Sequence, residues 1–311
     1  MTKLTRKRLL LAKSEGSTYG VSAAPTGADA MLISNLSVEP LQVELKDREL
    51  IRPYFGNSAK VVAKRMGAIK FDVEVAGSGT AGTAPKWGRL LQACGFAEAV
   101  TAGASVIYTP VSSGITSVTL DFNADGTKHL FTGCRGTASL SLKAGEIPKI
   151  SFDFTGIYNA AVDSAAVTPT FDNQAPPVIA NSQNTTNVSA FSFAGCMQEF
   201  SLALNNTTDF RQLMGCSQNI PITDRKPSGD INIEAPALSS KDFFAALSAQ
   251  TQGAITWQHG QTAGNIVTFN ANTTSLDGAG YDDSNGVMML KMPFIPIPSS
   301  SGNDELTLTL T

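Results

Sequence analysis

Residues 32–56, LISNLSVEPLQVELKDRELIRPYFG, can be laid without a gap on residues 191–215, FSFAGCMQEFSLALNNTTDFRQLMG. This alignment pairs Arg52 with Arg211, and a glycine ends both stretches. Both stretches begin with alternating apolar and polar residues, the pattern of a strand with one buried face. The sequence therefore predicts one β module that occurs twice.

The apolar members of the alternation fall on one another in this alignment. Since side chains alternate between the two faces of a strand, we expect both copies to bury the same face. The predicted pairs are Leu41 with Phe200, Val43 with Leu202, and Leu45 with Leu204.

The likeness continues after the shared glycine. Residues 63–77 and 223–237 both have a basic pair, then glycine, then an alternating strand. A short helix is expected at 87–95, between Pro85 and Gly95, and another at 240–250, where Ser240 can cap the first turn. We predict a mainly β fold, a duplicated β-sandwich or barrel module with one short flanking helix in each copy.

Turn signals and small-residue stretches suggest the domain boundaries. Asp125-Gly126 indicates a hairpin within a meander over 117–156. The expected organisation is an N-terminal arm at 1–30 with a few helical positions, a first module at 31–158, a linker at 159–188 and a second module at 189–311. The arm is too rich in small residues to fold alone, so it must dock on another surface.

Composition favours an assembling protein. The chain has 311 residues, 42% of them hydrophobic and only 16% charged, as expected of β modules that cover much of their surface with other protein. Its net charge is −3, with a cationic stretch at 1–13 and an anionic second half. We expect no secretory signal, no membrane span and reduced cysteines, and hence synthesis in the cytoplasm.

Several long strings resemble one protein family. They are FTGCRGTASLSLKAGEIPKISFDFTGIY (131–158), LLLAKSEGSTYGVSAAPTGADAMLISNL (9–36), ITDRKPSGDINIEAPALSSKDFFAAL (222–247), WQHG (257–260) and SGNDELTLTLT (301–311). Together they are similar to the tail tube, or major tail, proteins of bacteriophages with long noncontractile tails.

The resemblance implies a structural virion protein that forms stacked rings around a channel for DNA. Members usually have one module, whereas this chain is expected to have two, so a trimer with six modules would replace a hexamer. The implied partners are other copies of the chain and the tape measure, tail terminator and distal tail proteins. DNA would pass without specific binding, in a virion assembled in the host cytoplasm.

Two sets of residues are candidates for assembly. Polar loops at 46–67 and 205–229 and the basic arm are predicted to contact neighbouring subunits or rings, because such segments need another surface to hold them. Acidic side chains on alternating strands are predicted to face the lumen, where a basic wall would retain DNA. The contact candidates are Lys3, Arg6, Lys7, Arg8, Arg48, Arg52, Arg65, Arg211, Arg225 and Lys226, and the lumen candidates are Asp72, Glu74, Asp230 and Glu234.

No catalytic, cofactor or metal site is predicted, and no enzyme activity. The glycines of residues 77–82 lack the parallel βαβ unit of a dinucleotide site. His129 and His259 have no recognisable nucleophile near them in the sequence. Acidic residues at 277–283 could bind a hard cation but lack the EF-hand spacing. The alternative function is a β-sandwich adhesion module that recognises a surface receptor or glycan.

Overall fold

The computed structural model describes residues 2–165 and 167–311, so Met1 of the predicted arm and Ala166 of the predicted linker lie outside the described residues. It is mainly β, with 49% strand and 5% helix, and its sheets remain open. The predicted fold class is confirmed. The first half contains β1 (Arg8–Ser14), η1 (Gly27–Asp29), β2 (Ala30–Met31), β3 (Ser34–Lys46), β4 (Val61–Glu74), α1 (Gly88–Ala93), β5 (Phe96–Thr101), β6 (Ser105–Pro110), β7 (Val118–Ala124), β8 (Thr127–Lys143), β9 (Lys149–Tyr158) and β10 (Val162–Asp163).

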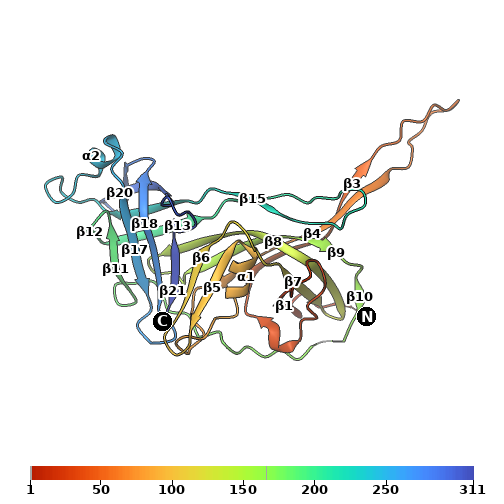
Figure 1. Cartoon of the computed structure of the whole chain (residues 1–311), viewed down its shortest axis with the longest axis horizontal. Coiled ribbons are helices and arrows are strands. Elements are labelled where there is room, and N and C mark those ends of the chain that lie inside the picture. The colour runs from red at the N-terminus through yellow and green to blue at the C-terminus, as the bar shows by residue number, and fades with distance from the viewer. Residues whose placement is uncertain (1, 166) are drawn as a thin grey trace.

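The second half follows a connector that runs along the outside of the molecule (Figure 1). It contains β11 (Thr185–Ala190), β12 (Phe193–Ala194), β13 (Met197–Ala203), β14 (Asn206–Thr208), β15 (Ile222–Arg225), β16 (Ser228–Glu234), α2 (Phe243–Ser248), β17 (Gly253–His259), β18 (Val267–Leu276), β19 (Gly280–Ser284), β20 (Val287–Pro296) and β21 (Thr307–Leu310).

The same path of antiparallel pairings occurs in both halves. In the first half it runs β1-β7-β8-β9-β4-β3. In the second it runs β11-β17-β18-β20-β16-β13. A β-bulge interrupts β7–β8 between Val118 and Leu120, and another interrupts β17–β18 at the corresponding place, between Gly253 and Ile255. A recurring path with a recurring bulge supports a duplicated unit.

The strand registers correct the gapless alignment. Val38 lies opposite Ile69, and the equivalent position in the second half is Leu202 opposite Gly229. Leu36 and Val38, which pack on the core, therefore occupy the places of Phe200 and Leu202. Leu41, Val43 and Leu45 lie further along β3 and are 46%, 42% and 44% exposed. The predicted pairing of apolar residues is wrong because the two hairpins differ in length.

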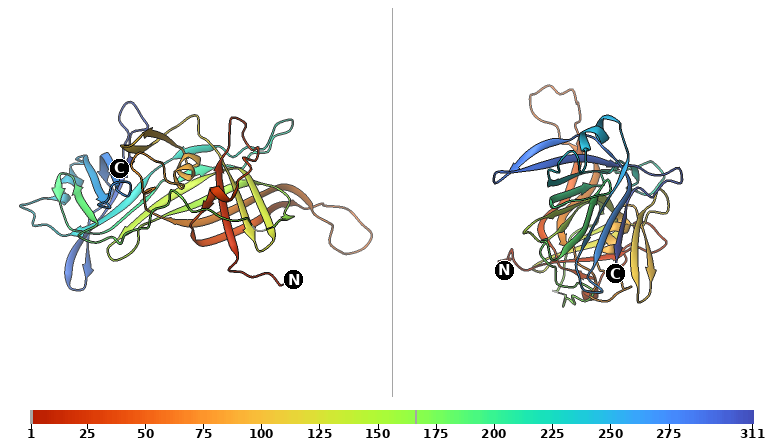
Figure 2. Two further views of the ribbon diagram at one scale, coloured as in Figure 1. Left: turned by 90° about the horizontal axis from the view of Figure 1, so that it is seen from below. Right: turned by 90° about the vertical axis from the view of Figure 1, so that its left-hand side faces the viewer.

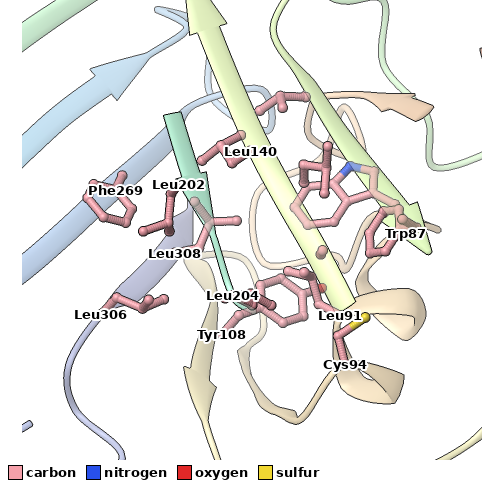
Figure 3. Close-up of a cluster of buried hydrophobic side chains, with 14 of the residues drawn as sticks. Trp87, Leu91, Cys94, Tyr108, Leu140, Leu202, Leu204, Phe269, Leu306 and Leu308 are labelled. Carbon is pink, nitrogen blue, oxygen red and sulfur yellow. The ribbon is translucent and has the colours of Figure 1, made fainter. Parts of the chain in front are cut away.

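Two strand pairings join the halves into one body. The C-terminal part of β8 pairs with β13, with Leu140 opposite Leu202, and β21 pairs with β6. Behind these strands, leucines and aromatic rings from both halves meet in a common core (Figure 3). The halves are thus joined edge to edge through continuous sheets.

The N-terminal segment is a strand, which corrects the expectation of helical positions. All seven residues of β1 pair with β7, and Leu10, Leu11 and Ala12 are fully buried. The apolar run Leu9 to Ala12 lies in β1, which pairs with β7 on one side and with β2 on the other. The predicted arm therefore docks on its own chain.

Both predicted helices are present. Gly95, with φ of +88°, follows α1 as expected for a residue that ends a helix. The cap of α2 is Asp242, whose carboxylate accepts from Ala245 N at 2.8 Å, rather than Ser240. Asp125 and Gly126, both with positive φ, form the predicted turn between β7 and β8.

Candidate assembly and lumen surfaces

One sheet spans both halves in the order β3-β4-β9-β8-β13-β16-β20-β19, here called the long sheet. Its inner face carries the core residues, such as Phe71 and Phe200. Its other face, the polar face, is rich in serine and charged side chains. Asp72 lies opposite Ser151, and Asp230 lies opposite Ser201.

All four lumen candidates lie on the polar face. Asp72 and Glu74 alternate with the buried Phe71 and Val73 of β4. Asp230 and Glu234 alternate with the buried Ile231 and Ile233 of β16. The strand registers place the two sets on the same side of the long sheet, because β9, β8 and β13 connect β4 with β16 without a change of face.

The charges of the polar face are mixed and slightly acidic. Lys70 Nζ lies 2.6 Å from Asp153, which raises the pKa of the lysine, and Lys291 Nζ lies 3.9 Å from Asp230. The registers of the eight strands place nine acids and six basic residues on this face: Glu39, Glu44, Asp72, Glu74, Asp153, Glu199, Asp230, Glu234 and Asp282, with Lys64, Lys70, Arg135, Lys143, Lys149 and Lys291.

The hairpin between β3 and β4, residues 46–61, is the first hairpin. It projects away from the body of the molecule (Figure 1, upper right). Its candidate Arg48 is exposed, and the guanidinium of Arg52 lies 5.9 Å from the ring centre of Tyr54. Arg65 is exposed on β4. The first hairpin and the adjoining strands also expose apolar side chains: Leu41, Val43, Leu45, Leu50, Ile51, Tyr54, Phe55, Val61 and Val62.

The hairpin between β13 and β16, residues 204–228, is the second hairpin. In contrast to the first, it is held against the first half (Figure 1). Asn206 Nδ2 donates to Cys94 O at 2.7 Å and to Gly136 O at 2.9 Å. Ile220 N donates to the Tyr19 hydroxyl at 2.8 Å. These contacts fix the second hairpin within the chain.

Arg225 lies inside this contact. Its guanidinium pairs with the Glu305 carboxylate at 2.7 Å and donates to Val111 O at 3.0 Å. The side chains of Arg225 and Glu305 are only 12% and 5% exposed. Of the other two candidates on the second hairpin, Arg211 is exposed and Lys226 is exposed beside Asp224, at 2.9 Å.

The basic candidates of the N-terminal segment lie next to the turn between β7 and β8. Lys7 Nζ is 3.9 Å from the Asp125 carboxylate, which also accepts from Leu4 N at 2.7 Å. Lys3 donates to Thr127. Arg6 and Arg8 are exposed. This short basic stretch can therefore reach a neighbouring surface while β1 holds it to the body.

A buried polar cluster around Glu15 was not predicted. The Glu15 carboxylate accepts from Ser117 Oγ at 2.5 Å, from Thr119 Oγ1 at 2.9 Å and from Gly133 N at 2.6 Å. Tyr19 lies beside it, and burial raises the pKa of this tyrosine to about 12. The one signal in the sequence is a lone aromatic residue among small ones. The cluster anchors the segment that follows β1.

Gly77, His129 and His259, the residues that could suggest a dinucleotide site or a hydrolytic site, have structural roles. Gly77 lies against Gly264 O, where a Cβ would come within 2.0 Å of that oxygen, so close packing explains this glycine. His259 is buried between Thr185 Oγ1, at 3.0 Å, and Val178 O, at 3.2 Å, and burial lowers its pKa. His129 stacks on Phe122, and its pKa is also lowered, mainly by burial.

The acidic segment at 277–283 does not form a cation cage. Asp282 and Asp283 are consecutive residues of β19 and therefore point to opposite faces. Within residues 2–165 and 167–311, no three potential metal ligands cluster together. All four cysteines are free; Cys94 and Cys134 are buried, which raises their thiol pKa values. Cys196 and Cys216 are exposed.

Comparison with known proteins identifies the family. No helix in the described residues has the length and apolar character needed to cross a membrane. A search of curated proteins found no match. The family model described as phage tail tube protein matches residues 5–311, nearly the whole chain. The resemblance inferred from the sequence is confirmed, and the protein belongs to the phage tail tube protein family, whose members are structural proteins of the virion tail.

Proposed function

We propose that three copies of the chain form a ring, that the rings stack into the tail tube, and that phage DNA passes along the polar face of the long sheet. The observation that carries this proposal is the gathering of all four lumen candidates on one face of a sheet that runs through both halves. The two halves of each chain would occupy alternate positions of a pseudo-sixfold ring.

The size of the long sheet supports a ring of three. Eight strands follow one another in it. Three such sheets side by side would give about 24 strands, and a spacing of about 4.8 Å with a tilt of about 40° gives a diameter of roughly 50 Å between backbones. Such a ring leaves room for a DNA duplex and its hydration.

The charge of the polar face suits passage without retention. Each phosphate that a lysine or arginine neutralises adds to the affinity for DNA. Here Lys70 and Lys291 are next to carboxylates, and acids outnumber lysines. The exposed first hairpin and the basic N-terminal residues supply contacts between subunits and rings, and the ends of the tube meet other tail proteins.

Electron imaging of purified, assembled protein with rotational averaging tests this proposal. We expect hollow rings or tubes with threefold symmetry and a pseudo-sixfold wall, and with the polar face inside. A lumen lined by another face, or a ring of six whole chains, would contradict it.

Charge reversal tests the role of the polar face. Glu74→Lys combined with Glu234→Lys should leave tubes that retain added double-stranded DNA at low salt and release it at high salt. The matched control is Glu146→Lys with Asp163→Lys, which adds the same charge at exposed positions off this face. Equal retention by both variants would show that the polar face does not meet DNA.

A further inference from the structure

The contact between the two halves provides a template for a contact between two copies. Within the chain, β13 extends the first half by pairing with residues Ser139 to Lys143 of β8. The second hairpin, which begins at the end of β13, then lies on the first half and is held there by Asn206, Ile220 and Arg225. One strand edge and one hairpin therefore make this junction.

The second half has a counterpart of the β8 edge. β18 and β19 follow one another along β20, separated by a bulge at residues 277–279, as β8 runs along β9. Lys291 of β20 is the counterpart of Ser151 of β9, and their partners are Gly280 and Ser139, so Gly280 to Ser284 of β19 correspond to Ser139 to Lys143 of β8. In the described residues β19 pairs with β20 alone, so its other edge is free. Tyr281, the counterpart of Leu140, is 59% exposed.

The first half has a counterpart of β13 that lacks a partner. Among the described residues, β3 pairs with β4 alone. Beyond this free edge the first hairpin exposes Ile51 and Phe55 completely, at 105% and 106%. An exposed apolar edge strand is a site for pairing with another chain.

We propose that β3 of one copy pairs antiparallel with β19 of a second copy, and that the first hairpin lies across the second half of that copy. Transfer of the β8–β13 register places Val38 opposite Tyr281, and Ser37 opposite Asp282. The inference rests on the proposed ring and specifies the strands that close it.

The geometry of the two free edges fits this contact. β3 and β19 are the two ends of the long sheet. Contacts between opposite ends are head-to-tail, and such contacts close into a ring when the rotation per chain divides a circle. Closure also removes both free edges, which leaves the polar face as one continuous wall.

Disulfide trapping tests the register. In a background with Cys196→Ser and Cys216→Ser, which removes the exposed thiols, Ser37→Cys is combined with Asp282→Cys. Directly opposite residues of antiparallel strands have the Cα separation that a disulfide needs. After mild oxidation of assembled protein we expect covalent species of two and three chains on denaturing gels, with three as the limit.

The matched control combines Ser37→Cys with Asp230→Cys. Asp230 also lies on the polar face, but β13 and β20 occupy both edges of its strand, so it should give at least tenfold less cross-linked product. Rings that assemble without the 37–282 cross-link, or with equal cross-linking at 230, would overturn this interface and leave the proposed function standing. A chain that never assembles would overturn the proposed function and the interface with it.

Discussion

The two hairpins differ in what surrounds them. The second hairpin follows β13, whose Phe200 and Leu202 are 0% and 5% exposed, and its own first residue, Leu204, is 4% exposed. The first half covers this hairpin. The first hairpin follows β3, whose Leu41 and Val43 are exposed, and this hairpin projects into solvent at one end of the molecule (Figure 2, left). The second hairpin is thus packed on another part of the chain, whereas the first hairpin is not.

The difference follows from position in the chain. The second hairpin has the first half beside it in the same polypeptide, whereas the first hairpin has no such neighbour among the described residues of its own chain. Burying apolar surface stabilises by about 25 cal/mol per Å². The exposed apolar side chains of the first hairpin therefore favour association with a second copy.

Deletion of residues 2–14 should have the largest effect and should abolish cooperative folding. It removes β1, with the fully buried Leu10 and Leu11, and leaves one edge of β7 unpaired. Circular dichroism during thermal unfolding provides the measurement. Deletion of residues 2–6 is the control and should keep a cooperative transition. An unchanged transition after deletion of 2–14 would show that β1 is dispensable for folding.

Phe200→Ala should destabilise the chain by about 4 kcal/mol, because it leaves a cavity among large rings. The Phe200 ring lies 4.9 Å from that of Phe269, 5.5 Å from Trp257 and 5.7 Å from Phe294, measured between ring centres. Leu41→Ala, on the exposed part of β3, is the matched change and should shift the unfolding free energy by less than about 0.5 kcal/mol. Urea denaturation of both variants measures the contrast. Similar losses would mean that β3 is covered in the isolated chain.

Arg225→Ala should cost about 3 kcal/mol, because it leaves the Glu305 carboxylate buried without its partner. Arg65→Ala, at an exposed member of the basic pair of the first half, should have almost no effect on the isolated chain. Replacement of both members of the pair, Arg225→Met with Glu305→Leu, should recover most of the loss. Failure to recover would show that the hydrogen bonds of Arg225 to backbone carbonyls stabilise the second hairpin more than the ion pair does.

Much of the fold could be predicted from local patterns. The strand at 68–76, the turn at Asp125-Gly126 and the two helices each have a signal within a few residues. The docking of β1 could not be predicted, because Leu9 to Ala12 is a short apolar run that fits a helix or a strand equally well. Its pairing with β7 is a contact between residues more than 100 positions apart.

The candidate surfaces could be predicted only in part. Alternation along β4 and β16 placed Asp72 and Asp230 on an outer face, but only the pairing through β9, β8 and β13 brings them to the same face. Arg225 and Arg65 each belong to the basic pair of their half of the chain. Their different surroundings depend on Glu305, which no pattern near either arginine reveals.

Lowering the pH should destabilise the second half through His259. Burial lowers the pKa of this imidazole, so below pH 6.5 the unfolded chain binds a proton that the folded chain does not. The contribution of neutral His259 to the free energy of unfolding is fully present above about pH 6.5. It falls by at most about 1.4 kcal/mol for each pH unit below that value, down to the pKa of His259 in the folded chain. Urea denaturation from pH 7.5 to 5.0 measures the slope. His259→Gln should reduce it more than His129→Gln, since His129 is only half-buried.

Ile51→Ser combined with Phe55→Ser should have the smallest effect on the isolated chain, less than about 0.5 kcal/mol, because both side chains are fully exposed. The same variant should raise the concentration needed for assembly at least tenfold, because it removes apolar surface that a neighbouring copy would bury. Light scattering against concentration measures assembly, and urea denaturation confirms the fold. The matched control is Val287→Ser with Met288→Ser at the exposed β19–β20 turn. If the hairpin variant assembled as well as the control, the first hairpin would be a solvent-exposed arm, and the contrast between the two hairpins would reflect length alone.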